Sequence, residues 1–313
     1  METLSAPRGL IVELITPLTR GGTIDAGALG RLLSRVAPFV QGIFLASPRA
    51  GDGTALTPDL RGSLLRETMI ALDQNPLPVF MWVTQADEDA TRETMETLRD
   101  ISEQHPYAAG RFWVDTPLYY HSNRGLPDLY RELCPLAGAP ILLHNDPVLI
   151  KELGKPLKRS NIRTAILKEL MAYSELSGMI FSGSLDRAHH YQRACRSRSD
   201  FRIYDGDEVQ FLDYPSKSGV VSMGANLAPG AWERIVRSSL HLSAHTKDYP
   251  DHLQQIWETG RDLRRMQTLY AGAPAAVIKD ALAYLGIIEP AVKPLDSSES
   301  LRDALRELLG RLG

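Results

Sequence analysis

The segment LSGMIFSGSLDR (residues 176–187) contains the pattern on which the fold of this chain is built. A short apolar run ends at a serine and a glycine, and a polar stretch follows, which is typical of a strand leading into a helix. The same pattern recurs along the chain and predicts eight strands. They are residues 9–15, 42–47, 78–84, 110–115, 139–145, 178–183, 201–206 and 219–224.

Eight strands that alternate with helices predict a closed TIM (β/α)₈ barrel rather than an open, doubly wound sheet. Asp25, Thr57 and Asp87 stand at N-cap positions ahead of helical stretches. We expect the barrel to occupy residues 1–230 and a C-terminal helical extension to occupy residues 231–313, with no flexible linker between them. The predicted helices of the extension are residues 249–271, 274–286 and 297–312.

The composition limits the function classes open to the chain. Its 313 residues are 43% hydrophobic, and a net charge of −3 with a pI near 6.3 offers no field that would attract nucleic acid. No apolar stretch reaches the ~18 residues that a membrane span needs. Cys134 and Cys195 are expected to be reduced, buried thiols. These features predict a cytoplasmic protein that binds neither nucleic acid nor membrane.

Familiar cofactor and metal motifs are missing from the sequence. It contains no HExxH, CxxC, GxxxxGK[ST] or strand-linked GxGxxG pattern, so we expect no bound cofactor and no resident metal. One alternative stays open. Asp115, His121, His144 and Asp146 have the nitrogen and oxygen atoms to bind a divalent metal, which would stabilise an enolate.

Motifs at the predicted strand ends resemble those of the dihydrodipicolinate synthase / N-acetylneuraminate lyase family. ELITPLTRGGTID (13–25) is similar to the family's opening A-L-x-T-P-F, and GIFLASPRAGDGTALT (42–57) to its segment ending in G-T-T-G-E. Five further matches follow in order: TPLYYHSNRGL (116–126), ILLHNDP (141–147), YDGDEVQFL (204–212), GVVSMGANLAP (219–229) and AAVIKDALAYLG (275–286). The resemblance implies a barrel lyase with a helical extension, assembled into homodimers or homotetramers.

The resemblance also implies a class I aldolase mechanism, and two of its central residues are replaced here. The family uses a lysine at the end of the sixth strand to form an imine with pyruvate, and a tyrosine at the end of the fifth strand to relay a proton. Phe181 is matched to the lysine and His144 to the tyrosine. Without an imine, the carbanion formed on carbon–carbon cleavage has no electron sink. We therefore expect no ordinary dihydrodipicolinate synthase activity.

No other lysine is predicted to replace the missing one. Residues 1–150 contain none, and the rest fall in loops, in helices or at the wrong end of the eighth strand. These lysines are Lys151, Lys155, Lys158, Lys168, Lys217, Lys247, Lys279 and Lys293.

Two gained charges allow two interpretations of the barrel mouth. Arg49 lies in the segment that holds the pyruvate carboxylate in the family, and Glu13 replaces a small alanine near the reacting carbonyl. In one interpretation, Glu13 and His144 form an acid–base pair and Arg49 binds a carboxylate. In the other, Glu13 pairs directly with Arg49 and plugs the site. The first interpretation has a further set of binding residues: Ser47, Tyr119, Tyr120, Phe181 and Val221.

The sequence leaves two function classes open. The protein is either an enzyme that handles a small keto acid or carboxylate without an imine, or a non-catalytic homologue that binds such a ligand or has a role in assembly. The substrate, and which of Tyr119 and Tyr120 faces the site, are also left open. The arginine-rich segment 193–202 is expected to be a solvated surface on the opposite face of the barrel.

Overall fold

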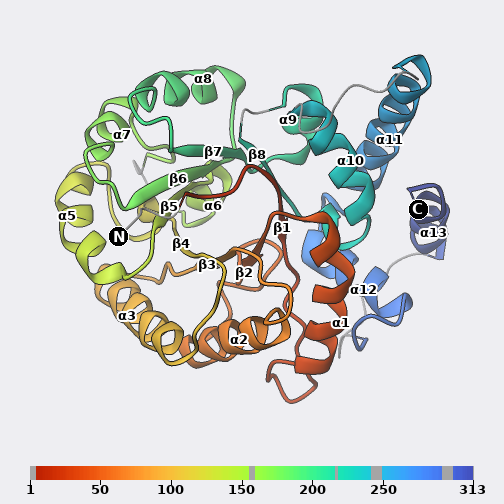
Figure 1. Ribbon diagram of the computed structural model, residues 1–313, viewed down its shortest axis with the longest axis horizontal. Helices are drawn as coiled ribbons and strands as arrows, with labels where there is room; N and C mark the ends of the chain where they lie inside the picture. Colours follow the sequence, from red (N-terminus) through yellow and green to blue (C-terminus); the bar gives the residue numbers. More distant parts are fainter. Residues whose placement is uncertain (1–4, 155–158, 216–217, 241–248, 291–298, 313) are drawn as a thin grey trace.

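The computed structural model describes residues 5–154, 159–215, 218–240, 249–290 and 299–312. Eight parallel strands close into a barrel in the order β1 to β8, and helices surround it (Figure 1). The fold prediction is therefore confirmed: the chain is a TIM barrel with C-terminal helices.

The strands coincide closely with the predicted apolar runs. Their parallel pairing continues round the barrel and closes between β1 and β8. They are β1 (Gly9–Glu13), β2 (Gly42–Leu45), β3 (Val79–Trp82), β4 (Arg111–Asp115), β5 (Ile141–Asn145), β6 (Leu176–Phe181), β7 (Arg202–Asp205) and β8 (Gly219–Ser222).

The helices begin where the capping residues predict. Asp25, Thr57 and Asp87 each accept a hydrogen bond from the backbone N–H three residues on. Around the barrel lie α1 (Ala26–Val36), α2 (Pro58–Ala71), α3 (Glu88–Gln104), α4 (Pro117–Tyr120), α5 (Leu126–Ala137), α6 (Pro147–Glu152), α7 (Thr164–Leu170), α8 (Leu185–Ala194), α9 (Glu208–Asp213) and α10 (Pro229–Ser239), with short 3₁₀ turns at Ala37–Phe39 and Gly224–Asn226. The extension contains α11 (Tyr249–Tyr270), α12 (Pro274–Tyr284) and α13 (Glu299–Leu312).

The buried apolar residues form two layers, because successive strand residues point to opposite sides of the sheet. One layer lies between the strands and the helices. The other fills the barrel, where the rings of Phe80 and Phe112 stack with their centres 4.8 Å apart. The inner layer consists of Ala6, Ile11, Phe44, Phe80, Trp82, Phe112, Val114, Leu142, Ile180, Tyr204 and Val221.

The C-terminal helices lie on one side of the barrel, next to α1 and α10 (Figure 1). Lys279 of α12 forms an ion pair with Asp52, in the loop that follows β2. The predicted boundary at residue 230 falls within α10, so the division into barrel and extension stays a prediction. Among the described residues, no helix is long and apolar enough to cross a membrane.

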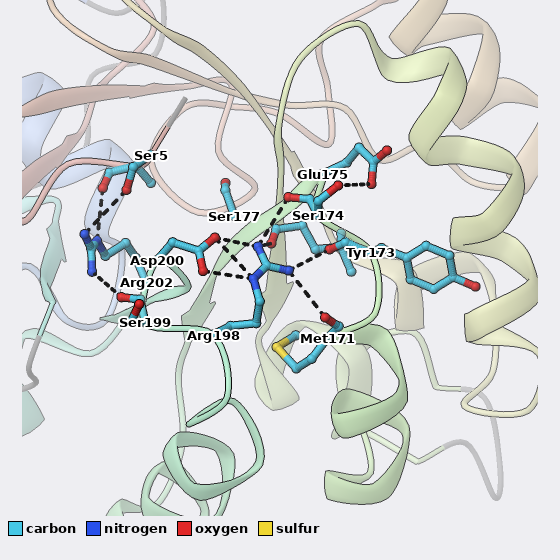
Figure 2. Close-up of polar contacts among 12 residues, drawn as sticks. Ser5, Met171, Tyr173, Ser174, Glu175, Ser177, Arg198, Ser199, Asp200 and Arg202 are labelled. Atoms are coloured by element: carbon cyan, nitrogen blue, oxygen red, sulfur yellow. Dashed lines mark hydrogen bonds and ion pairs between the residues drawn. The ribbon is translucent and has the colours of Figure 1, made fainter. Parts of the chain in front are cut away.

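The arginine-rich segment is only in part the expected solvated surface: Arg193 and Arg196 are exposed, whereas Arg198 and Arg202 are half-buried. The side chain of Arg198 is only 17% exposed, and it donates hydrogen bonds to Asp200 and to backbone carbonyl oxygens between α7 and β6 (Figure 2). Arg202 likewise bonds to the carbonyl oxygen of Ala6. These arginines therefore hold loops together at the amino ends of the strands. Cys134 and Cys195 are buried and free.

Candidate functional site

The loop after β2 brings polar groups to the carboxyl end of the barrel. Ala46 and Asp52 have positive φ angles of 50° and 56°, a conformation that is costly for residues other than glycine. The loop folds tightly on itself between them, since a Cβ on Gly53 would lie 1.9 Å from the carbonyl oxygen of Ala46. This folding holds Ser47 and Arg49 in place above the strands.

Glu13 ends β1 with its side chain buried beneath this loop. The residue is 3% exposed, and its carboxyl group lies close to the Ser47 hydroxyl and the backbone of Ala50, both of which favour its ionised form. Burial raises the pKa of Glu13, and the nearby Arg49 charge only partly opposes that shift. The Ser47 hydroxyl also accepts from the N–H groups of Ala50 and Gly51, at 3.2 and 2.8 Å. Ser47 therefore shapes the loop.

Arg49 extends across the barrel mouth towards the ends of β5, β6 and β7. Its Nε lies 3.5 Å from Oδ2 of Asp146, and its Nη2 donates to the carbonyl oxygen of Gly206 at 2.6 Å. The Ser182 hydroxyl lies 3.5 Å from the same nitrogen. No ion pair joins Arg49 to Glu13 in the described part of the chain. The arrangement is therefore different from the direct Glu13–Arg49 plug.

Asp146 is the carboxylate that faces Arg49. Its Oδ1 accepts hydrogen bonds from the N–H groups of Val148 and Leu149, which caps α6. Its Oδ2 is buried and has no hydrogen-bond partner among the described residues, so the charge of Arg49 is its main compensation. Arg49 is one-third exposed, whereas Asp146 is almost completely buried.

His144 lies near the end of β5, two residues before Asp146. Its Nδ1 is 2.9 Å from the hydroxyl of Thr116, which also accepts a 2.8 Å hydrogen bond from the indole N–H of Trp82. Burial lowers the pKa of His144 to about 4; Arg49 acts in the same direction and Asp146 opposes it. The imidazole is therefore neutral near pH 7.

Comparison with known proteins gives this site a family context. The model of the Dihydrodipicolinate synthetase family matches residues 6–310. The chain belongs to the dihydrodipicolinate synthetase family. It is 26% identical to a 4-hydroxy-tetrahydrodipicolinate synthase of Alcanivorax borkumensis, with 98% of each chain covered.

Solved structures of the dihydrodipicolinate synthetase family share the fold. A monomeric dihydrodipicolinate synthase variant is similar with a TM-score of 0.78 and 19% identity, over 98% of this chain and 97% of that one. The chloride-inhibited synthase from Acinetobacter baumannii, complexed with pyruvate, is similar with a TM-score of 0.76 and 18% identity, over 98% and 99%.

The structure corrects the residue matched to the family's lysine. Phe181 points away from the barrel interior, because it packs in the outer layer with its ring edge-on to Tyr191 of α8, at 5.0 Å between centres. Ile180 belongs to the inner layer and is aligned with His144 of β5. The sixth-strand residue that lies beside His144 inside the barrel is therefore Ile180, and Phe181 does not form the base of the site.

The described lysines are Lys151, Lys168 and Lys279. Lys151 and Lys168 are exposed on α6 and α7. Lys279 reaches the loop after β2, contrary to the expectation that no lysine comes near this face, but its ammonium group is paired with Asp52. The other five lie outside the described residues: Lys155, Lys158, Lys217, Lys247 and Lys293.

The two tyrosines of the loop after β4 have different surroundings. The hydroxyl of Tyr120 donates to the buried carboxylate of Asp115 at 2.9 Å, so the end of β4 fixes the position of this side chain. The ring of Tyr119 lies edge-on to Trp82, with 6.1 Å between ring centres. Val221 points into the barrel, level with Ile11 of β1.

The alternative metal site does not assemble in the described part of the chain. Asp115 accepts hydrogen bonds from Thr84, Tyr120 and Tyr130, which occupy its oxygens. His121 is partly exposed, and its Nδ1 bonds to the carbonyl oxygen of Ser122. No group of three or more metal-binding side chains occurs among the described residues.

Sequence reasoning missed several residues that complete the site. Asp146 appears among the sequence-based expectations only as a metal ligand; its place directly after β5, as the N-cap of α6, is the signal that points to the barrel mouth. Thr116 and Trp82 carried no signal, since their role depends on contacts between strands. Glu208 was also missed: this buried carboxylate accepts hydrogen bonds from Ser222 and Tyr270, both at 2.5 Å.

Proposed function

We propose that this protein binds a small keto acid or carboxylate at the carboxyl end of the barrel and acts on it as a lyase by general acid–base chemistry, without a pyruvate imine. One observation carries the proposal. Arg49 Nη1 and His144 Nε2 have no hydrogen-bond partner among the described residues, yet neither is one of that region's fully buried, unpartnered atoms. Solvent therefore reaches both nitrogens, and in this proposal a ligand takes the place of that solvent.

The charges of the site suit a small anionic ligand. Arg49 supplies a positive charge and a donor nitrogen for a carboxylate. Glu13 has a raised pKa and His144 a lowered one, and such a divergence is typical of groups that exchange protons with a substrate. In the imine mechanism, the iminium nitrogen takes up the electrons of the carbanion. In this proposal, hydrogen-bond donors instead stabilise the negative charge that develops on the keto oxygen of the ligand.

The second candidate is a non-catalytic homologue that binds a carboxylate or has a role in assembly. It is favoured by the engagement of Arg49 Nε and Nη2 with Asp146 and Gly206, which leaves one nitrogen for a ligand.

Because the Acinetobacter baumannii enzyme is complexed with pyruvate, pyruvate is the first ligand to test. Exchange of its methyl protons in D₂O, followed by proton NMR, separates the candidates. Only the acid–base enzyme accelerates that exchange, and it should lose the acceleration in Glu13→Gln.

Treatment with pyruvate and borohydride is expected to leave the mass of the protein unchanged, because none of the strands in the described part of the chain carries a lysine. Intact-protein mass spectrometry checks this. The matched variants are Ile180→Lys, which places an amine beside His144, and Phe181→Lys, whose amine would point towards α8. We expect an adduct only in the Ile180→Lys variant. An adduct on a lysine of the natural sequence, Lys279 included, would refute the imine-free proposal.

Arg49→Ala is expected to weaken pyruvate binding about tenfold or more, as removal of a charge-assisted contact does. It should also lower stability by about 1–3 kcal/mol, because the buried carboxylate of Asp146 loses its partner, although Arg49 itself is one-third exposed. The double variant Arg49→Ala/Asp146→Asn should recover stability but not binding, and Arg131→Ala on the exposed face serves as the control. Calorimetry and urea unfolding measure the two effects. Undiminished binding in Arg49→Ala would contradict the role given to Arg49.

We also propose that the protein is a cytoplasmic homodimer or homotetramer. The free, buried cysteines fit a reducing compartment, and the family resemblance supports assembly. Light scattering at micromolar concentration should show a homo-oligomer. A stable monomer, the state of the similar dihydrodipicolinate synthase variant named above, would contradict this proposal.

A further inference from the structure

A directional chain of hydrogen bonds ends on Nδ1 of His144. An indole N–H can only donate, so Trp82 donates to the Thr116 hydroxyl. The hydroxyl proton of Thr116 must then point elsewhere, and among the described residues the remaining partner of this oxygen is Nδ1 of His144. If Nδ1 accepts that proton, the neutral imidazole carries its own hydrogen on Nε2.

The opposite tautomer leaves one group unsatisfied. If Nδ1–H donated to Thr116, the hydroxyl would accept two hydrogen bonds and its proton would have no acceptor within the described part of the protein. Thr116 is completely buried, and an unpaired polar hydrogen in such a place is costly. Only the tautomer with the hydrogen on Nε2 pairs every atom of this chain: the indole N–H, the Thr116 hydroxyl and Nδ1 of His144.

Packing holds this chain of hydrogen bonds in one geometry. The guanidinium of Arg61 lies 5.0 Å from the centre of the Trp82 ring, and Tyr119 meets the same ring edge-on. Arg61 is itself fixed, since it donates to the carbonyl oxygens of Gly53 and Thr84. The ring of Phe44 lies edge-on to His144, with 6.4 Å between centres. The indole and the imidazole thus have little freedom to turn.

We propose that His144 acts as a neutral donor that presents Nε2–H to the ligand, and that Thr116 and Trp82 are positioning residues that fix this tautomer. The ligand role rests on the proposed function. In that function, His144 polarises the keto oxygen of the ligand. Proton removal next to the carbonyl is then the task of Glu13. The lowered pKa of His144 agrees with a neutral ring. Neutral imidazole is an effective electrophile of this kind in other barrel enzymes.

Nitrogen NMR of the ligand-free protein, labelled with ¹⁵N-histidine, tests the tautomer. The His144→Gln variant identifies the signal of His144. We expect the wild-type protein to show a protonated Nε2 and an unprotonated Nδ1 near pH 7. In Thr116→Val the preference should be lost, whereas Thr116→Ser should retain it. Thr68→Val, which removes a buried hydroxyl that has no partner among the described residues, should leave the signal unchanged.

A protonated Nδ1 in the wild-type protein would overturn the proposal, as would an unchanged tautomer in Thr116→Val. If Thr116→Val does not fold, the wild-type spectrum still decides. Because these measurements use no ligand, their outcome is independent of pyruvate binding. A failure of the proposed function would show instead as absent binding by a protein whose tautomer is as expected.

Discussion

Replacing Asp115 by alanine is expected to destabilise the protein by about 3–5 kcal/mol, the largest effect of any single substitution proposed for this barrel. The carboxylate is buried and accepts hydrogen bonds from Thr84, Tyr120 and Tyr130, at 2.7, 2.9 and 2.7 Å. Its loss would leave three hydroxyl groups without their acceptor at the junction of β3, β4 and α5. Urea unfolding, monitored by circular dichroism, gives the free energy of unfolding.

Two further variants make this measurement specific. Asp115→Asn keeps the shape of the side chain and one acceptor oxygen, so we expect a smaller loss than in the alanine variant. Asp186→Ala removes a carboxylate that is 87% exposed and should be nearly neutral. A loss below ~1 kcal/mol in Asp115→Ala would show that the three hydroxyls find other partners, and the account of this cluster would fail.

The second large effect is a pH dependence of stability that originates from His144. Its pKa falls from 6.5 to about 4 on folding, so the unfolded chain binds the proton more tightly. The stabilising contribution is therefore fully present above the unfolded pKa and is lost as the pH falls towards the folded pKa. From these values, the free energy of unfolding should be about 2 kcal/mol lower at about pH 5 than at about pH 7.5 through this group alone.

The variant His144→Gln isolates this contribution. Glu13, Asp115 and Glu208 have raised pKa values, which make stability decrease as the pH rises, but they are present in both proteins and cancel in the comparison. The difference in unfolding free energy between the wild-type and variant proteins should therefore increase from pH 5 to pH 7.5. A difference that does not change over this range would mean that His144 is not buried as a neutral ring.

The barrel could be predicted because its signals are local. Each strand is a short apolar run that ends in polar residues, as at GMIFSG, and helix starts such as Asp25 and Thr57 are set by contacts within one turn. The match of the sixth strand to the family pattern is wrong by one residue, and this error does not affect the prediction of the strand itself. It left β6 in place, although it assigned Phe181 to the interior in place of Ile180.

The site was less predictable, because its decisive contacts join residues that are distant in the sequence. Charge and position placed Glu13, Arg49 and His144 at the barrel mouth, but they did not show that Arg49 pairs with Asp146 while Glu13 turns towards Ser47. The link from Trp82 through Thr116 to His144 depends on three neighbouring strands meeting at one height. Such alignments follow from the stagger of the closed barrel, which no single segment encodes.

The ion pair between Lys279 and Asp52 joins the C-terminal helices to the carboxyl end of the barrel. Asp52 has a left-handed backbone conformation in the loop that carries Arg49, and Lys279 belongs to a helix of the C-terminal extension. A displacement of α12 must therefore either break this pair or pull the loop with it. The extension thus braces this loop mechanically, and a truncation after the barrel would loosen the loop that carries Arg49 even if every strand stayed in place.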